Sequence, residues 1–195
     1  GGSTQGMLSA LTLACRPGDS VLLDRGCHRS VYNALALLDL HPVFLSRPWL
    51  AEEGAAGPIL PQDVENLLDS HPEIRTVCIT SPNYYGMLSD LPALARLIHH
   101  RGGKLVVDAA HGAHLPFLGY AGMEEADIAV VSAHKTLPAL GQTALLLSGK
   151  SSGFAHGDLR SAASLYGSSS PSYVLMASLD LARAWMEEEG KAAYE

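Results

Sequence analysis

The stretch KLVVDAAHGAH at residues 104–114 decides the fold class of this 195-residue chain. It opens with a short apolar run that suits a strand buried on both faces, and this run ends at Asp108. The stretch IAVVSAHKT at residues 128–136 repeats the arrangement and places Lys135 just after its strand. Short Val- and Leu-rich runs separated by helical patterns predict a parallel sheet with helices on both faces.

The same alternation extends outward along the whole chain. Strands are predicted at residues 20–24, 42–46, 76–80, 104–108, 128–132 and 143–148. Helices are predicted at residues 4–15, 29–40, 61–70, 91–101, 162–166 and 172–189. Residues 52–58 are rich in Gly and Ala, which predicts a surface loop. We therefore expect one α/β domain with a three-layer α/β/α arrangement and a mostly parallel, mixed sheet.

Composition excludes several classes of function. Hydrophobic residues make up 47% of the chain and charged residues 17%, a balance that favours a buried sheet over a disordered chain. The net charge is −7 and no Lys/Arg cluster is present, so we expect no nucleic-acid partner. No apolar run approaches the ~18 residues of a membrane span, so no membrane association is expected. Three cysteines without a C-x-x-C pair favour a reducing, cytoplasmic location.

Polar side chains follow the predicted strands at their carboxyl ends. Ligands of an open parallel sheet bind outside these ends, so we expect the chemistry there. The polar segments that share this position are residues 24–30, 81–86, 108–114 and 132–136.

An acid at one strand end and a lysine beyond another suit a pyridoxal phosphate (PLP) site. The lysine forms an imine with the cofactor, and a carboxylate paired with the pyridinium keeps the ring an electron sink. Asp108 and Lys135 are the candidates for these two roles. The glycine-rich residues 1–6 precede a predicted helix, whose backbone N–H groups and positive dipole end suit a phosphate.

At this point the sequence resembles a known family. The motifs DRGCHRSVYNAL (24–35), TSPNYYGMLSDL (80–91), VVDAAHGAH (106–114), SAHKTLPALGQTALL (132–146) and SSSPSYVLMASLDLARAW (168–185) occur in this order. They resemble the bacterial ornithine/lysine/arginine decarboxylases, which are fold-type-I PLP enzymes with an aspartate aminotransferase-like major domain. The resemblance implies PLP-dependent decarboxylation of a basic amino acid to an amine and CO₂, as in polyamine biosynthesis.

The resemblance also implies roles for individual residues. Lys135 would carry the cofactor as a Schiff base, and Asp108 would pair with its ring nitrogen. His28 would stack on the ring, Ala110 would pack beneath it, and His111 would reach the phenolic oxygen or the substrate carboxylate.

Further residues are implied to bind the phosphate or to serve a second subunit. Two subunits of this fold usually complete each other's sites, so a homodimer or higher homo-oligomer is expected, with residues 168–170 reaching the neighbour's cofactor. The residues that match the family's phosphate contacts are Ser3, Thr4, Ser132 and His134.

The sequence departs from the family pattern in two respects. Ala109 stands where the family commonly has Glu, and the opening glycine loop is short. Residues 1–195 are expected to be a PLP-binding large domain truncated at both ends, with residues 157–195 leading towards a small C-terminal domain. The identity of the basic amino acid and the activity of this piece alone therefore stay open.

Other interpretations of the same residues also remain. The protein is alternatively another fold-type-I PLP enzyme, such as an aminotransferase or lyase, or a non-catalytic relative that keeps the fold. Lys135 alone suits a solvated surface charge, and Asp108 alone suits a helix cap. His111 and His114 have a spacing that suits a metal, but no third ligand is evident and no metal is expected. Tyr84 and Tyr85 suit either the core or a ligand contact.

Overall fold

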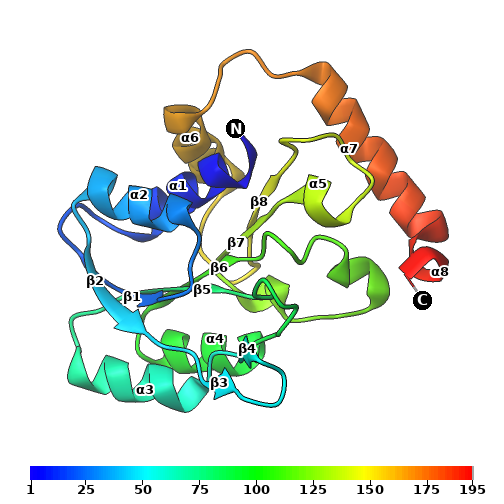
Figure 1. The fold of residues 1–195 in the computed structure, drawn as a ribbon. Coiled ribbons are helices and arrows are strands. Elements are labelled where there is room, and N and C mark those ends of the chain that lie inside the picture. The colour runs from blue at the N-terminus through cyan, green and yellow to red at the C-terminus, as the bar shows by residue number, and fades with distance from the viewer. Residues whose placement is uncertain (195) are drawn as a thin grey trace.

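The computed structural model describes residues 1–194, which fold around a six-stranded sheet (Figure 1). The strand order is β2-β1-β5-β6-β7-β8, and neighbours pair in parallel except for β8, which is antiparallel to β7. The strands are β1 (Ser20–Asp24), β2 (His41–Leu45), β5 (Thr76–Thr80), β6 (Lys104–Asp108), β7 (Ile128–Val131) and β8 (Leu145–Ser148). The predicted three-layer α/β fold with a mostly parallel, mixed sheet is confirmed.

Helices cover both faces of the sheet because alternate strand residues point to opposite sides. On one face Val77, Leu105 and Val107 pack with α3 (Pro61–Ser70) and α4 (Leu91–His100). On the other face Cys78, Val106 and Val130 pack with the remaining layer of helices. This second layer consists of α1 (Gly2–Ala14) and α2 (Arg29–Leu38), with α6 (His156–Tyr166) against α1 (Figure 1).

Local chemistry sets several helix boundaries. The α2 helix ends where Asp39 adopts a left-handed conformation with φ 52°. In α4, the side chain of Asp90 accepts a hydrogen bond from the Ala93 amide at 2.9 Å and caps the first turn. A Cβ on Gly6 would lie 2.7 Å from Cγ1 of Val130, so glycine lets α1 approach the sheet closely.

Two predicted element starts were wrong for local reasons. The last strand begins at Leu145 instead of residue 143 because the Thr143 amide and hydroxyl both donate to the Leu140 carbonyl, which makes a turn. The helix predicted at 162–166 begins at His156, since Asp158 accepts a hydrogen bond from the Ala155 amide and fixes an earlier start.

Two further segments differ from the prediction. The predicted loop at 52–58 forms part of a hairpin in which β3 (Trp49–Leu50) pairs with β4 (Ala55–Ala56). The helix predicted at 172–189 divides into α7 (Tyr173–Trp185) and a π-helical turn, η3 (Met186–Gly190), with α8 (Lys191–Tyr194) following. Two short 3₁₀ turns, η1 (Leu115–Leu118) and η2 (Met123–Glu125), connect β6 to β7.

The parallel register brings several polar residues to one edge of the sheet. Thr80 pairs with Asp108, and Asp108 pairs with Val130 one residue before the end of β7. Asp24 ends β1 at the same edge. Within residues 1–194, no helix is both long enough and apolar enough to cross a membrane.

Candidate active site

Asp108 and Lys135 come from neighbouring strands. Asp108 is the last residue of β6, and its partner Val130 lies near the end of β7. The chain then passes through Ser132, which is the N-cap of the short helix α5 (Ala133–Thr136) that carries Lys135. Because both strands run in parallel, the carboxylate and the amine lie at the same edge of the sheet.

Asp108 is a buried acid with few partners. Its side chain accepts one hydrogen bond, from the Ala110 amide to Oδ1 at 3.1 Å, and no other from the residues that the structure describes. Burial raises the pKa of Asp108, while the Ala110 N–H and then the charges of His28, Lys135 and His111 oppose the rise. The same three groups therefore lie close enough to Asp108 to act on its charge.

Lys135 contacts His111 directly. The Lys135 Nζ lies 3.2 Å from Nε2 of His111. Burial lowers the pKa of His111 and the charge of Lys135 lowers it further, while a backbone hydrogen bond to Asn83 and the charge of Asp108 act in the opposite direction. A neutral His111 accepts a hydrogen bond at Nε2 from the lysine ammonium. Lys135 and His111, two of the residues predicted to be catalytic, are thus in direct contact.

His28 and Ala110 are the two residues that were predicted to contact the cofactor ring. His28 is the N-cap of α2, where its Nδ1 accepts a hydrogen bond from the Ser30 amide at 3.2 Å. Ala110 follows Asp108 by two residues and is 7% exposed. The cap fixes the imidazole of His28 at the carboxyl end of the sheet, close enough to act on the charge of Asp108.

The four predicted phosphate contacts lie in two groups. Ser132 is fully buried, and its Oγ lies 3.4 Å from Nδ1 of His134, which also lies 3.1 Å from the Thr143 carbonyl oxygen. Ser3 and Thr4 lie in the first turn of α1, which has no acidic side chain. Among the described residues, no hydrogen bond joins these two groups directly.

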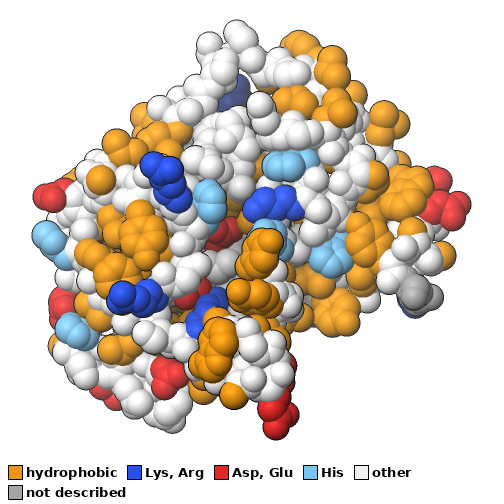
Figure 2. All heavy atoms as spheres, in the orientation of Figure 1, with side chains coloured by type: hydrophobic (Ala, Val, Ile, Leu, Met, Phe, Trp, Pro, Cys, Tyr) orange, Lys and Arg blue, Asp and Glu red, His pale blue; other side chains and the backbone are white. Residues whose placement is uncertain are grey.

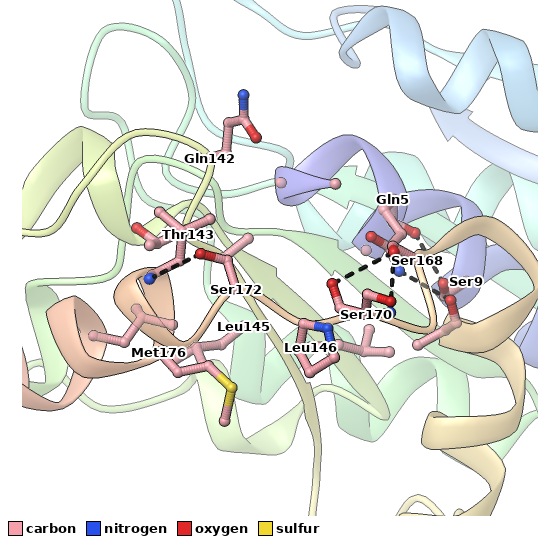
Figure 3. Close-up of a pocket in the computed structure, with 18 residues that line it drawn as sticks. Gln5, Ser9, Gln142, Thr143, Leu145, Leu146, Ser168, Ser170, Ser172 and Met176 are labelled. Carbon is pink, nitrogen blue, oxygen red and sulfur yellow. Dashed lines mark hydrogen bonds between the residues drawn. The ribbon is translucent and has the colours of Figure 1, made fainter.

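Ser168 and Ser170, from the segment 168–170, line a cavity within the same chain. Its volume is about 450 Å³, and α1, β8 and the segment before α7 form its walls. Figure 3 shows Gln5, Ser9, Thr143, Ser168 and Ser172 among the residues around this cavity. The predicted contact of this segment with a second subunit stays a prediction.

A buried ion pair near the site has no counterpart in the sequence analysis. Asp24 is fully buried, and its Oδ2 lies 2.6 Å from Nη2 of Arg47. The Thr80 amide also donates to Asp24, while Arg47 donates to the carbonyls of Thr80 and Gly57. This network ties the ends of β1 and β5 to the β3–β4 hairpin. Polar residues after two strands were the available signal, but their pairing depends on the fold.

Tyr84 and Tyr85 are surface residues and not core aromatics. Their side chains are 82% and 60% exposed, and the two rings meet edge to face with centroids 5.6 Å apart. The ring of Tyr84 also meets His111 edge-on at 5.8 Å. His114, in contrast, stacks on Tyr194 with ring centroids 5.3 Å apart, so His111 and His114 face different neighbours.

The surface view shows several ionisable side chains gathered on one face of the molecule. Figure 2 shows histidine and Lys or Arg side chains around a recess near the middle of this face, with an acidic side chain visible inside it. Hydrophobic side chains lie directly beside the recess.

Solved structures share this fold at low sequence identity. The chain superposes on E. coli constitutive lysine decarboxylase with a TM-score of 0.79 and 22% identity, over 97% of this chain and 29% of that one. Pyridoxamine-pyruvate aminotransferase from Mesorhizobium loti gives a TM-score of 0.72 and 21% identity, over 99% of this chain and 52% of that one. The fold is therefore that of the large domain of fold-type-I PLP-dependent enzymes.

Sequence comparison identifies the family within this class. The family model "Orn/Lys/Arg decarboxylase, major domain" matches residues 1–195, and the chain belongs to this family. The uncharacterized protein YaaO of Bacillus subtilis (strain 168) is 36% identical over 95% of this chain and 40% of its own length. An arginine decarboxylase of Bacillus anthracis is 31% identical over all of this chain and 40% of its own length. The chain thus spans about 40% of the length of these relatives.

Proposed function

We propose that the protein containing this chain is a PLP-dependent decarboxylase of a basic amino acid, with ornithine, lysine or arginine as substrate. The observation that carries the proposal is the convergence of Asp108, Lys135, His111 and His28 at one edge of the sheet. The buried acid and the lysine arise from adjacent strand ends, and His111 bridges towards the lysine at 3.2 Å. Family membership supports the decarboxylation reaction.

The surroundings of the Asp108 carboxylate suit the ring of the cofactor. A carboxylate that is 2% exposed and accepts a single hydrogen bond retains acceptor capacity for a pyridinium N–H. Burial disfavours the charge of Asp108, and a cationic partner would favour it, so the site is electrostatically suited to a pyridinium. We propose that Asp108 holds this ring nitrogen, while His28 stacks on the ring and the small Ala110 leaves room for it.

The polar groups at the first turn of α1 and before Lys135 fit a phosphate. Ser3 and Thr4 offer hydroxyls and free backbone N–H groups at a helix end without acidic residues. The buried hydroxyl of Ser132 and the ring of His134 offer further polar contacts. We propose these four residues as phosphate ligands.

The chemistry divides between the cofactor and the side chains. PLP, when bound, supplies an electron sink for the bond that breaks at the substrate α-carbon. Asp108 sustains that sink by keeping the ring nitrogen protonated. Decarboxylation releases CO₂ and requires one proton at the same carbon. Lys135 and His111 lie within hydrogen-bond distance, so either holds this proton and the other replenishes it.

Selection of the substrate's side chain and assembly into an oligomer are proposed for the protein that contains this chain. Because the chain spans about 40% of its relatives, we propose that residues outside it help to select the basic side chain. We also propose a cytoplasmic homodimer with shared sites, in which residues 168–170 approach the partner's cofactor. The chain would be the large, cofactor-binding domain, and residues 157–195 would lead towards a smaller domain.

The test uses the full-length protein with PLP and each of the three amino acids. We expect CO₂ and the matching amine from one of them: putrescine, cadaverine or agmatine. Release of CO₂ and formation of the amine are measured separately, with mass spectrometry for the amine. PLP binding without CO₂ from any of the three would reject the substrate assignment.

Two controls separate the alternative functions. Lys135→Ala should abolish the visible absorbance of the enzyme imine together with CO₂ release, because no other group is proposed to attach the cofactor. Amino transfer that depends on an added keto acid would instead indicate an aminotransferase. A protein without the imine absorbance would indicate a non-catalytic relative.

A further inference from the structure

A rigid turn presents Tyr84 at the surface. The buried Asn83 holds this turn: its side-chain oxygen accepts from the amides of Tyr85 and Met87 at 2.9 and 3.0 Å. Its side-chain nitrogen donates to the Ala56 carbonyl at 2.7 Å, which anchors the turn to the β3–β4 hairpin. The backbone that carries Tyr84 is therefore fixed, although the ring itself is 82% exposed.

The exposed ring of Tyr84 contacts His111, which together with Lys135 is proposed to supply the proton. Its only ring neighbours among residues 1–194 are Tyr85 and His111, with centroids at 5.6 and 5.8 Å. His111 in turn lies 3.2 Å from Nζ of Lys135. The contact between Tyr84 and His111 is edge-to-face, at a 71° angle, which is a favoured geometry for two aromatic rings. The hydroxyl of Tyr84 makes no hydrogen bond within the described residues.

Several charged groups act on His111 besides this ring. Lys135 faces it from α5, Asp108 from the end of β6, and His28 from the start of α2. A backbone hydrogen bond connects it to Asn83, in the same turn as Tyr84. Partial burial is the largest influence on its protonation, and an aromatic ring against the imidazole contributes to that burial.

We propose that Tyr84 is a positioning residue, whose ring holds the imidazole of His111 where Nε2 meets Lys135. The proposal rests on the proposed function, because it concerns the proton that decarboxylation requires. Tyr84 needs no contact with the substrate for this role. Phenylalanine should replace it, since the ring and not the hydroxyl contacts His111.

The first experiment compares Tyr84→Ala and Tyr84→Phe in the full-length enzyme. We expect Tyr84→Ala to lower kcat about 10-fold with KM nearly unchanged, since a loosened proton donor slows the chemical step. Tyr84→Phe should stay within about 2-fold of the wild type, by the same reasoning. Tyr120→Ala is the matched control, because Tyr120 is also exposed and contacts no other aromatic ring of the described chain.

A second measurement does not depend on activity. Histidines labelled with ¹³C are titrated by NMR in the cofactor-free, full-length protein, with His111→Gln identifying the His111 signal. We expect Tyr84→Ala to raise the pKa of His111 towards its ordinary value, because the imidazole becomes more hydrated. Tyr84→Phe should leave the titration unchanged. This readout decides the proposal even if the wild-type protein releases no CO₂.

Two results would overturn the proposal. An unchanged His111 titration in Tyr84→Ala would show that the ring does not shield the imidazole. A loss of activity carried by KM alone would show that Tyr84 contacts the substrate instead. Tyr84→Ala is expected to fold like the wild type, because the Tyr84 side chain is 82% exposed and its truncation removes little buried area.

Discussion

At the scale of single residues, the buried charge of Asp108 destabilises the fold, and the same charge is proposed to bind the cofactor's ring nitrogen. Its carboxylate is buried, and burial raises its pKa above the ordinary value. In the cofactor-free protein this charge lacks a strong cationic partner, so the site is electrostatically unsatisfied until a cation arrives. Residues of this kind are more informative about function than the surrounding apolar core, because packing alone does not explain them.

Asp108→Asn should change stability and cofactor binding in opposite directions. A raised pKa means that the folded protein retains a proton that the unfolded chain releases, so wild-type stability falls as the pH rises from the unfolded value of about 3.9 through the folded pKa. The variant lacks this loss, and cofactor-free Asp108→Asn should be the more stable protein at neutral pH. The difference should shrink towards acid pH. PLP affinity should fall about 10-fold or more, because a charge-assisted hydrogen bond is lost.

Urea unfolding from about pH 4 to about pH 8, a range that begins near the unfolded pKa, measures the first effect, and titration with PLP measures the second. Parallel stability curves for wild type and variant across this range would contradict a raised pKa for Asp108.

At the scale of elements, the Asp24–Arg47 pair fixes three segments at the edge that carries the site. Both side chains are nearly inaccessible to solvent, with exposures of 0% and 6%. Arg47 donates to the carbonyls of Thr80 at the end of β5 and of Gly57 just after β4, and Asn83 donates to the adjacent carbonyl of Ala56 at the same end of the hairpin. The hairpin and the Tyr84 turn are therefore positioned by buried polar contacts and not by sheet pairing alone.

Arg47→Ala should destabilise the fold by about 3–5 kcal/mol, because it leaves the carboxylate of Asp24 buried without its partner. Chemical denaturation of the full-length protein measures this loss. Arg183→Ala provides the matched control, since Arg183 pairs with Asp180 and Glu187 on the surface and its loss should change stability little. Equal effects of the two substitutions would reject a structural role for the buried pair.

At the scale of the whole molecule, α7 presents an apolar surface. Tyr173, Val174 and Leu181 are 79%, 68% and 71% exposed, and Met176 is 53% exposed. Exposed large side chains gathered on one helix are typical of a protein interface. In the proposed homodimer, this helix would contribute to the contact with the second copy.

Val174→Glu combined with Leu181→Glu should therefore weaken self-association of the full-length protein. Two charges at an apolar contact lack partners there and resist removal from water. Analytical ultracentrifugation is expected to show a dimer for the wild type and a larger monomer fraction for the double variant. A wild-type protein that sediments as a monomer at all concentrations would contradict the proposed assembly.

The sequence by itself determined the layered α/β fold, the approximate strands and the positions of Asp108 and Lys135. These features are local: apolar runs report burial, and a residue just after a parallel strand lies at the ligand-binding edge. The assignment of the family also came from ordered local motifs. Strand and helix ends were less predictable, as at Leu145 and His156, because side-chain hydrogen bonds set them.

Only the tertiary structure decided which distant side chains meet. The contact of Lys135 with His111, the pairing of Asp24 with Arg47 and the position of Tyr84 against His111 join separate segments of the chain. Local sequence patterns do not reveal the distance between two strand ends or the direction of a side chain in a turn. Those depend on how the strands are ordered and how closely the layers pack, which is a property of the folded chain as a whole.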